Sequence, residues 1–260
     1  MLLALDTATE ICAVALVRDA QVIERVEHVG QRHSQRLIPM AQSLLAEAGI
    51  GPSALDAVAF GAGPGSFTGL RIACGVAQGL AYAIDRPVVA VGNLEALALD
   101  AARAAPGARR VAAAIDARMG ECYWAVFQVH RGRDAAVPHP AAGRDAAARS
   151  LDDASEIGLT QIVAPSLSRA EALPDLLLDL APDTLAGEAF AHFAAQLDRV
   201  SAACRQPQAA ASAGAIGLLG VRGLRAGFAV APSLAAPVYV RDRVAQTIEE
   251  RLASRAARPA

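Results

Sequence analysis

The chain has 260 residues, of which 54% are apolar and 19% charged, enough apolar material for a sizeable core in one or two globular domains. The formal net charge of −2 and the pI of about 6.2 argue against an extended nucleic-acid surface, because such surfaces are usually basic. Every Lys+Arg position is arginine, which excludes chemistry that needs a lysine, such as a Schiff base or a Walker phosphate loop.

Hydrophobic periodicity in the first hundred residues predicts alternating strands and helices, as in an α/β domain. In chain order, the expected elements are strands 2–6, 11–17 and 21–27, helix 34–48, strand 57–62, helix 70–84, strand 87–91 and helix 94–104. Asp19 and Ala20 form the expected turn between the second and third strands. Pro106 and Gly107 mark a boundary, so the first domain is expected to cover residues 1–106.

Residues 107–260 form the expected second domain, in which the pattern is weaker. Its expected elements are strands 110–115 and 121–129, a loop over 131–153, strand 161–164, helices 171–180 and 187–204, a linker over 206–211, helix 213–225 and an extended piece at 238–241. The tail from Asp242 onward is expected to be helical at best. The last helix of this domain is expected to pack back on the first domain.

An internal repeat links the two halves of the chain. Asp6 followed by Cys12 recurs as Asp116 followed by Cys122, so in each half an aspartate ends one strand and a cysteine begins the next. Two hairpins of this kind indicate a duplicated α/β domain.

The cysteines and the N-terminal residues bear on the compartment. Cys12, Cys74, Cys122 and Cys204 lie far apart and form no C-x-x-C pair, so neither a disulfide framework nor a zinc knuckle is predicted. Residues 1–6 lack the basic start of a signal peptide. No uninterrupted apolar run reaches the roughly 18 residues of a membrane span. We therefore expect a reduced, cytoplasmic protein that does not contact a membrane.

The segment GAGPGSFTGLR, residues 61–71, is rich in glycine, follows a buried strand and opens a helix. Glycines can adopt positive φ and bring backbone amides near a ligand, and a helix N-terminus adds partial positive charge, so the loop can bind an anion. The alternative is a tight turn without ligand, capped by Thr68. The segment is neither a P-loop nor a nucleophile elbow, because it lacks the lysine and the G-x-S-x-G spacing. The candidate anion-binding residues in this loop are Gly63, Gly65, Ser66, Thr68, Gly69 and Arg71.

Asp6, Thr7 and Thr9 stand at the end of the first expected strand. A carboxylate beside two hydroxyls can hold a metal-bound phosphate or orient a water. The alternative is an aspartate that bonds the backbone of its own turn. No two histidines are four residues apart, and a glycine-containing break separates His28 from His33, so no metal site is predicted.

Several of these segments resemble the TsaB family, also called YeaZ. The matching stretches are LALDTATEICAVAL at 3–16, RHSQRLIPM at 32–40, GAGPGSFTGLRIA at 61–73, GVAQGLA at 75–81, IDARMGECYWAVF at 115–127 and PVYVR at 237–241. The resemblance implies an α/β protein with the actin and sugar-kinase (ASKHA) fold, built from two ribonuclease-H-like subdomains. It also implies a role in placing threonylcarbamoyl on the adenosine beside the tRNA anticodon.

The related TsaD family is implied to carry the chemistry, with an N-H-L-E-G-H stretch whose two histidines hold a metal. Residues 92–97 of this chain resemble that stretch, with Asn93 and Leu97 at the histidine positions. Because leucine cannot bind a metal, the resemblance implies a non-catalytic subunit. No catalytic residue, metal or cofactor of its own is then expected.

The resemblance further implies TsaD as the partner, with TsaE joining the complex and a homodimer forming when TsaD is absent. tRNA would be met through the complex only, and ATP or ADP, if bound, at the junction with TsaD. Helices 33–48 and 70–84 are expected to form the contact surface, because small and apolar residues four apart share a helix face. The expected interface residues are His33, Leu37, Ile38, Leu44, Leu45, Ile72, Val76, Ala77 and Leu80.

Two other functions remain open at this point. An independent nucleotide-dependent enzyme of the same fold would need a complete nucleotide cleft, and the sequence shows no second phosphate loop beyond Asp116. A metallopeptidase would need metal ligands, and the missing histidine pair argues against it.

Overall fold

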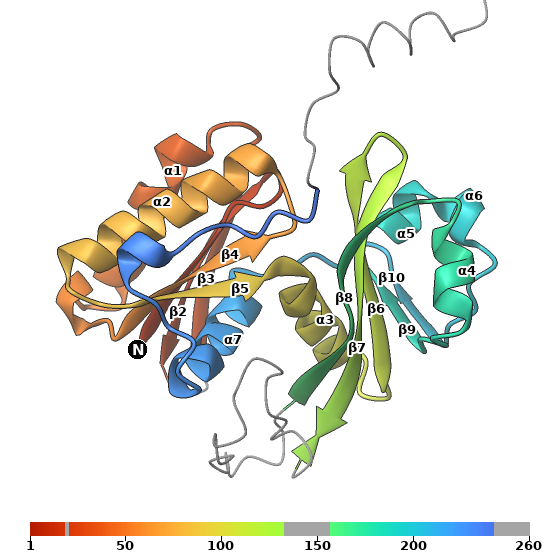
Figure 1. Ribbon diagram of the computed structural model, residues 1–260. Helices are drawn as coiled ribbons and strands as arrows, with labels where there is room; N and C mark the ends of the chain where they lie inside the picture. Colours follow the sequence, from red (N-terminus) through yellow and green to blue (C-terminus); the bar gives the residue numbers. More distant parts are fainter. Residues whose placement is uncertain (19–20, 133–156, 242–260) are drawn as a thin grey trace, which may run out of the picture.

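A computed structural model of the chain describes residues 1–18, 21–132 and 157–241, which form two lobes side by side (Figure 1). The predicted turn at Asp19 and Ala20, most of the predicted loop over 131–153 and the tail from Asp242 lie outside these residues. Within the described ranges, no helix is both long enough and apolar enough to cross a bilayer.

Each lobe is built on a five-stranded sheet, and the two sheets share one topology. The order is β3-β2-β1-β4-β5 in the first lobe and β10-β9-β6-β7-β8 in the second. In each sheet the first three strands are antiparallel, and the last two join in parallel. The first sheet comprises β1 (Leu2–Asp6), β2 (Ile11–Arg18), β3 (Gln21–His28), β4 (Ala57–Gly63) and β5 (Val88–Gly92). The second comprises β6 (Arg110–Arg118), β7 (Glu121–Arg131), β8 (Ile157–Arg169), β9 (Thr184–Ala186) and β10 (Cys204–Gln206).

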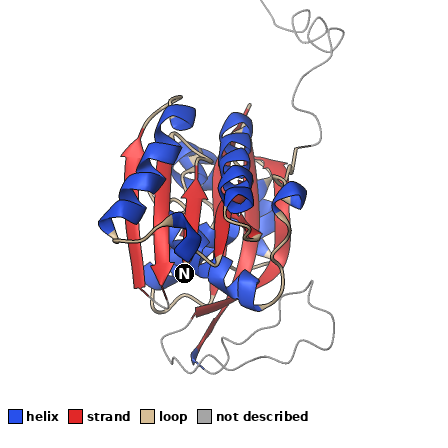
Figure 2. Cartoon of the chain, turned by 90° about the vertical axis from the view of Figure 1, so that its left-hand side faces the viewer, coloured by secondary structure: helices blue, strands red, loops and turns tan. Residues whose placement is uncertain are grey.

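Helices cover both faces of the first sheet, as Figure 2 shows from the side. The helices α1 (His33–Glu47) and α2 (Phe67–Ala83) lie on one face, and α7 (Ala213–Arg225) lies on the other (Figure 1). Because side chains alternate along β1, Leu3 and Leu5 join the core under α1 and α2, whereas Leu2 and Ala4 join the core under α7.

Glycines let α7 pack closely on the first sheet. A Cβ atom at Gly217 would lie 2.4 Å from Val17 Cγ2, and one at Gly220 would lie 2.7 Å from Ala59 Cβ. These distances leave no room for a side chain, so the small residues of α7 serve helix-to-sheet contact.

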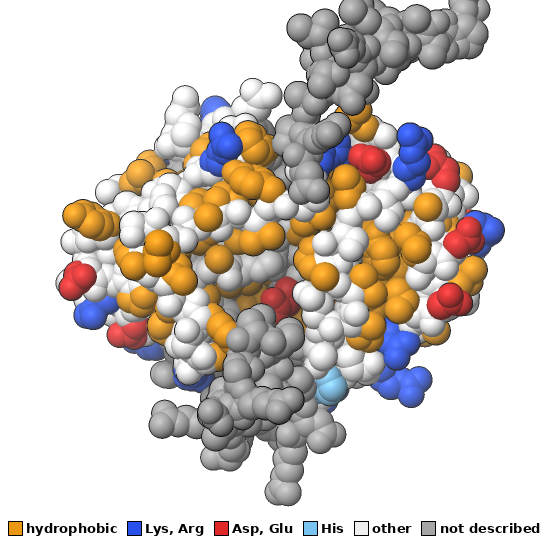
Figure 3. Space-filling view, viewed as in Figure 1, with side chains coloured by type: hydrophobic (Ala, Val, Ile, Leu, Met, Phe, Trp, Pro, Cys, Tyr) orange, Lys and Arg blue, Asp and Glu red, His pale blue; other side chains and the backbone are white. Residues whose placement is uncertain are grey.

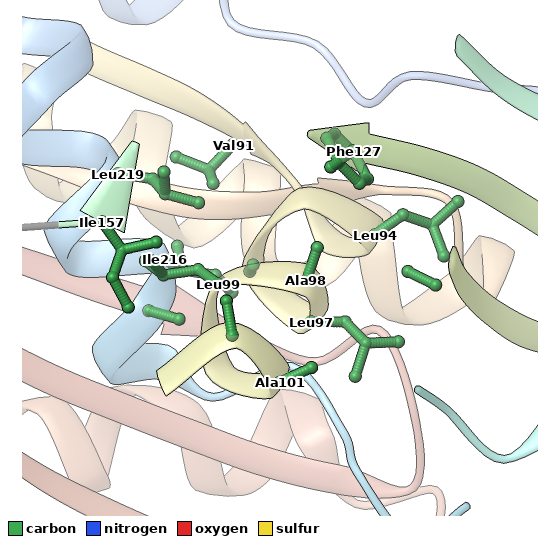
Figure 4. Packing of buried hydrophobic residues seen from close by; sticks show 14 of the residues in the cluster. Val91, Leu94, Leu97, Ala98, Leu99, Ala101, Phe127, Ile157, Ile216 and Leu219 are labelled. Carbon is green, nitrogen blue, oxygen red and sulfur yellow. The ribbon is translucent and has the colours of Figure 1, made fainter. Parts of the chain in front are cut away.

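The helix α3 (Asn93–Ala104) lies between the lobes and is mostly buried. Its side chains Leu94, Leu97 and Leu99 join a core cluster with Ile216 of α7 and Phe127 of β7 (Figure 4). One apolar core therefore runs through both lobes. Short elements complete the fold: η1 (Pro52–Ala54), α4 (Leu173–Leu178), α5 (Ala189–His192), α6 (Ala194–Leu197) and η3 (Pro232–Leu234).

The predicted elements of the first lobe match the structure closely, and those of the second lobe less well. The predicted helix 187–204 is wrong: α5 and α6 are short, Phe193 between them leaves helical geometry, and the segment ends in β10. The strand β9 was not predicted, and β8 is longer than the predicted strand 161–164. Apolar spacing did not reveal these short elements because the parallel pairing of β9 with β6 and β10 determines them.

Candidate functional site

Asp6 lies at the end of β1 and is 3% exposed. Asn93 Nδ2 donates to Asp6 Oδ1 at 2.9 Å, and Asn93 Oδ1 accepts from the backbone amide of Gly63 at 2.7 Å. The backbone amides of Thr7 and Ala8 also bond the Asp6 carboxylate. The bonds from Thr7 and Ala8 match the alternative of an aspartate bonded to the backbone of its own turn. The link through Asn93 to α3 and to the end of β4 was not predicted.

Burial raises the pKa of Asp6 from 3.8 to about 6, although hydrogen bonds from Asn93, Ala8 and Thr7 oppose the shift. Because the pKa of Asp6 is higher in the folded chain than in the unfolded chain, the folded chain binds more protons than the unfolded chain between pH 4 and pH 6. Stability from this group is therefore lost as the pH rises through that window. The loss amounts to about 3 kcal/mol, since one pKa unit corresponds to about 1.4 kcal/mol.

Asp6→Asn is expected to flatten this part of the pH profile, because the amide does not ionise and its oxygen can still accept from Asn93. Urea unfolding from pH 4 to pH 7 gives the free energy of unfolding of the unaltered chain and of Asp6→Asn. The contributions of the other carboxyl groups cancel in the difference between the two values. Parallel profiles for the two proteins would contradict the assignment.

The turn between β4 and α2 is held by hydroxyl groups. Ser66 caps α2, with its Oγ accepting from the Gly69 amide at 3.3 Å and its own amide donating to the Ala8 carbonyl at 2.7 Å. Thr7 Oγ1 donates to the Gly69 carbonyl at 2.7 Å. The expected cap by Thr68 is wrong, because Thr68 is exposed and lies inside the helix. With Ser66 as the cap, α2 begins at Phe67 instead of the predicted residue 70.

The glycines of the turn are needed mainly for close approach. A Cβ atom at Gly65 would lie 2.7 Å from Ala8 Cβ, and one at Gly69 would lie 1.8 Å from the Thr7 carbonyl oxygen. Neither Gly65 nor Gly69 has a positive φ. In this turn Gly63 has a positive φ, of +123°. The expected reason for glycine at 65 and 69 is therefore corrected from backbone conformation to contact with the β1–β2 turn.

Thr9 and Arg71 are engaged by neighbouring groups. Thr9 Oγ1 accepts from the Ile11 amide at 3.2 Å. The Arg71 guanidinium lies 3.9 Å from the centre of the Phe67 ring, and its Nε donates to Tyr239 Oη at 3.0 Å. Both side chains therefore have structural contacts of their own.

A cleft of about 930 Å³ lies between the lobes, in front of the turn. The residues Thr9, Ser66, Thr68 and Gly69 line it from the first lobe, and Asp116 lines it from the β6–β7 hairpin. Asp116 is bonded by Arg118, whose amide donates at 2.7 Å. The two aspartate-bearing hairpins of the internal repeat thus belong to opposite lobes, and residues from both turns border the cleft.

Most of the expected interface residues are buried inside the chain. His33, Leu37, Leu44, Leu45 and Ala77 lie in the core, so they cannot contact a partner while the chain is folded as described. This corrects their expected place on the surface, which arose because helix periodicity does not say which apolar stripe faces the sheet. His33 Nε2 has no hydrogen-bond partner among the residues that the structure describes.

A smaller apolar face remains accessible on α1 and α2. Ile38 is 42% exposed, and Ile72, Val76 and Leu80 are half-buried. Gly75 and Gly79 are exposed, and outside their own helix no described atom lies within 4 Å of a Cβ added at either position. Tyr82 is 82% exposed. Tyr82 was not predicted as an interface residue, because the sequence does not show that it is exposed until the buried side of the helix is known. Figure 3 shows side chains coloured as hydrophobic over this lobe and over the second lobe. We call these accessible residues the helix face: Ile38, Ile72, Gly75, Val76, Gly79, Leu80 and Tyr82.

Asn93 and Leu97 border a small cavity beside Asp6. The Asn93 amide is used by Asp6 and Gly63, and Leu97 is 1% exposed within the core. Among the described residues, no group of three or more His, Cys, Asp or Glu side chains is placed to hold a metal ion.

The two sheets of equal topology, their helices and the cleft between them define an actin and sugar-kinase-like protein with two subdomains. A family model described as "TsaD: tRNA N6-adenosine threonylcarbamoyltransferase" matches residues 25–248. A solved structure described as "YeaZ from Pseudomonas aeruginosa" is 37% identical, with a TM-score of 0.69 over 92% of this chain and 98% of that chain. The chain therefore belongs to the TsaD-type family, and within that family to the TsaB (YeaZ) group.

Other relatives are similar over part of their length. The tRNA threonylcarbamoyladenosine biosynthesis protein TsaB of Escherichia coli is 50% identical over 127 residues, which are 49% of this chain and 54% of that protein. The protein of the same name from Haemophilus influenzae is 49% identical over 47% of this chain and 52% of its own length. The chain thus spans about half the length of the curated relatives it matches.

Proposed function

We propose that the chain is a non-catalytic subunit in the formation of threonylcarbamoyladenosine in tRNA, where it binds and activates TsaD. The names of its relatives in Escherichia coli and Haemophilus influenzae support the pathway. The match to the TsaD-type family supports a common fold for the two partners.

The state of Asn93 and Leu97 supports a non-catalytic role. They stand where the resemblance to TsaD implies two metal-holding histidines. Here Asn93 bridges Asp6 and Gly63, and Leu97 packs in the core. The positions that would hold a metal in the partner thus serve stability in this chain.

The helix face is the proposed contact surface for TsaD. It combines half-buried aliphatic side chains with two glycines that allow another helix to approach closely. A second copy of the chain would use the same face when TsaD is absent, so the two assemblies would exclude each other. TsaE, tRNA and any ATP or ADP would then meet the chain in the complex, in the cytoplasm.

Reconstitution tests the proposal. Purified TsaD, TsaE, tRNA and threonylcarbamoyl-adenylate are incubated with and without this chain, and threonylcarbamoyladenosine is measured by mass spectrometry. Modification is expected only when the chain and TsaD are both present. Modification that proceeds equally well without the chain would contradict the proposed activation.

The competing enzymatic functions are tested on the chain alone. The proposed role predicts no ATP hydrolysis and no peptide cleavage by the isolated protein. Sustained turnover of either kind by the isolated chain would show that the chain is an enzyme.

A further inference from the structure

After α7 the chain returns across the first lobe as a segment that is irregular apart from the short helix η3, residues 229–241, here called the strap (Figure 1). Val230 pairs with Val88 of β5 through two backbone hydrogen bonds of 2.9 Å. Further along, the carbonyl oxygen of Ala235 accepts from Gln78 Nε2 at 3.0 Å and from Cys74 Sγ at 3.5 Å. The strap is therefore fixed to the edge of the first sheet and to α2.

The strap occupies its own side of α2. The side chains that it contacts, Phe67, Arg71, Cys74 and Gln78, are spaced three or four residues apart and so share one face of the helix. The helix face uses a different stripe, so the strap leaves it uncovered.

Beyond α2 the strap crosses the end of β4. The amide of Val238 donates to the Ala62 carbonyl at 2.7 Å, and its carbonyl oxygen lies 2.6 Å from where a Cβ atom of Gly63 would be. The Tyr239 ring lies 5.2 Å from the Phe67 ring, at the start of α2. Residues 238–241 line the cleft together with this turn, so the strap lies at its border.

The strap ends on the second lobe. Arg241 Nη2 donates to the Ala117 carbonyl at 2.9 Å and to Glu121 Oε2 at 2.7 Å, and Nη1 lies 3.5 Å from Met119 Sδ. The Arg241 and Glu121 side chains are 16% and 29% exposed. Water therefore screens this ion pair less than it screens a pair on the open surface. Arg241 thus joins a segment fixed to the first lobe to the β6–β7 hairpin of the second.

The β6–β7 hairpin, which Arg241 contacts, has a turn whose backbone conformation is energetically unfavourable. Arg118 and Met119 have φ of 65° and 59°, and Gly120 has φ of 74°. Two consecutive non-glycine residues in the left-handed region persist only when their surroundings hold them. The three Arg241 contacts surround this turn on both sides.

We propose that the strap is a clasp between the lobes: Arg241 holds the β6–β7 hairpin to the first lobe at the border of the cleft. When the Arg241 contacts are lost, the strap is expected to lift from β4 and to uncover Ala62 and Gly63, which are buried at the end of that strand. The clasp depends on neither TsaD nor catalysis, so it can be tested on the isolated chain.

Hydrogen exchange of Arg241→Gln tests the clasp. The amide of Val238, now bonded to Ala62, and the amides of the cleft turn are expected to exchange at least about tenfold faster, since a hydrogen bond to a charged group is lost. Circular dichroism establishes that the variant is folded.

Arg199→Gln is the matched control, because it removes an exposed ion pair with Asp175 elsewhere in the second lobe. Its exchange in the strap and the cleft turn is expected to equal that of the unaltered chain. Glu121→Gln provides a milder second test, which also applies if Arg241→Gln does not fold, and is expected to shift exchange in the same direction. Exchange in the strap that is the same in Glu121→Gln, Arg199→Gln and the unaltered chain would overturn the proposal.

Discussion

Replacing Gly69 by alanine is expected to destabilise the chain by about 3 kcal/mol or more, because overpacking at a fixed backbone contact is relieved only by moving the backbone. The new Cβ atom would lie 1.8 Å from the carbonyl oxygen of Thr7. Relief would also break the bond from Thr7 Oγ1 to the Gly69 carbonyl and disturb the Ser66 cap. A loss of this size is a large part of the stability of an ordinary domain.

Gly75→Ala on the same helix is the control for this change. Gly75 is exposed, and apart from its chain neighbours and the backbone of its own helix, no atom of the described residues lies within 4 Å of its added Cβ. Alanine is therefore expected to stabilise the chain by about 0.5 to 1 kcal/mol through helix propensity. Urea unfolding of the two variants measures the contrast. A Gly69→Ala chain as stable as the unaltered one would show that the turn can relax freely.

Arginine at two positions of α2 is expected to give opposite results. Ala77 is fully buried against the sheet, so Ala77→Arg places an unpaired charge in the core and is expected to prevent folding. Leu80 is half-buried on the helix face, so Leu80→Arg is expected to fold. A charge desolvated at the proposed contact costs several kcal/mol, enough to weaken a micromolar complex at least about 100-fold.

Leu178→Arg is the matched control for Leu80→Arg, because Leu178 is exposed on α4 of the second lobe. Circular dichroism, analytical ultracentrifugation and TsaD binding by calorimetry are measured for both. Leu80→Arg is expected to lose TsaD binding and self-association, while Leu178→Arg keeps them. A folded Leu80→Arg chain that binds TsaD normally would place the contact elsewhere.

Local sequence patterns predicted the first lobe well because its elements are long and strongly patterned. The five buried residues of β1 and the small-residue helix α7 have the predicted bounds. The start of α2 was misplaced because Ser66 and Thr68 are both good cap residues, and the contact of Ser66 with Ala8 decides between them.

The candidate site depended on contacts that local patterns do not contain. The bond between Asp6 and Asn93 joins residues 87 positions apart, and the bond from Arg241 to Ala117 spans 124. The sequence predicted that Asp6 and the glycine loop form one region of interest. It could not show that Asn93 satisfies the aspartate or that the glycines make room for the β1–β2 turn.

The placement of α7 has a consequence for how the protein is made. Ile216 and Leu219 pack in one cluster with Leu2 and Ala4, although the whole second lobe lies between them in the sequence. During synthesis, one apolar face of the first sheet therefore stays uncovered until the whole second lobe has been synthesised, because α7 follows β10 in the sequence. Contacts of such long sequence separation form slowly. The first lobe therefore begins to be synthesised before the second lobe, but its fold can be completed only after the second lobe has been made.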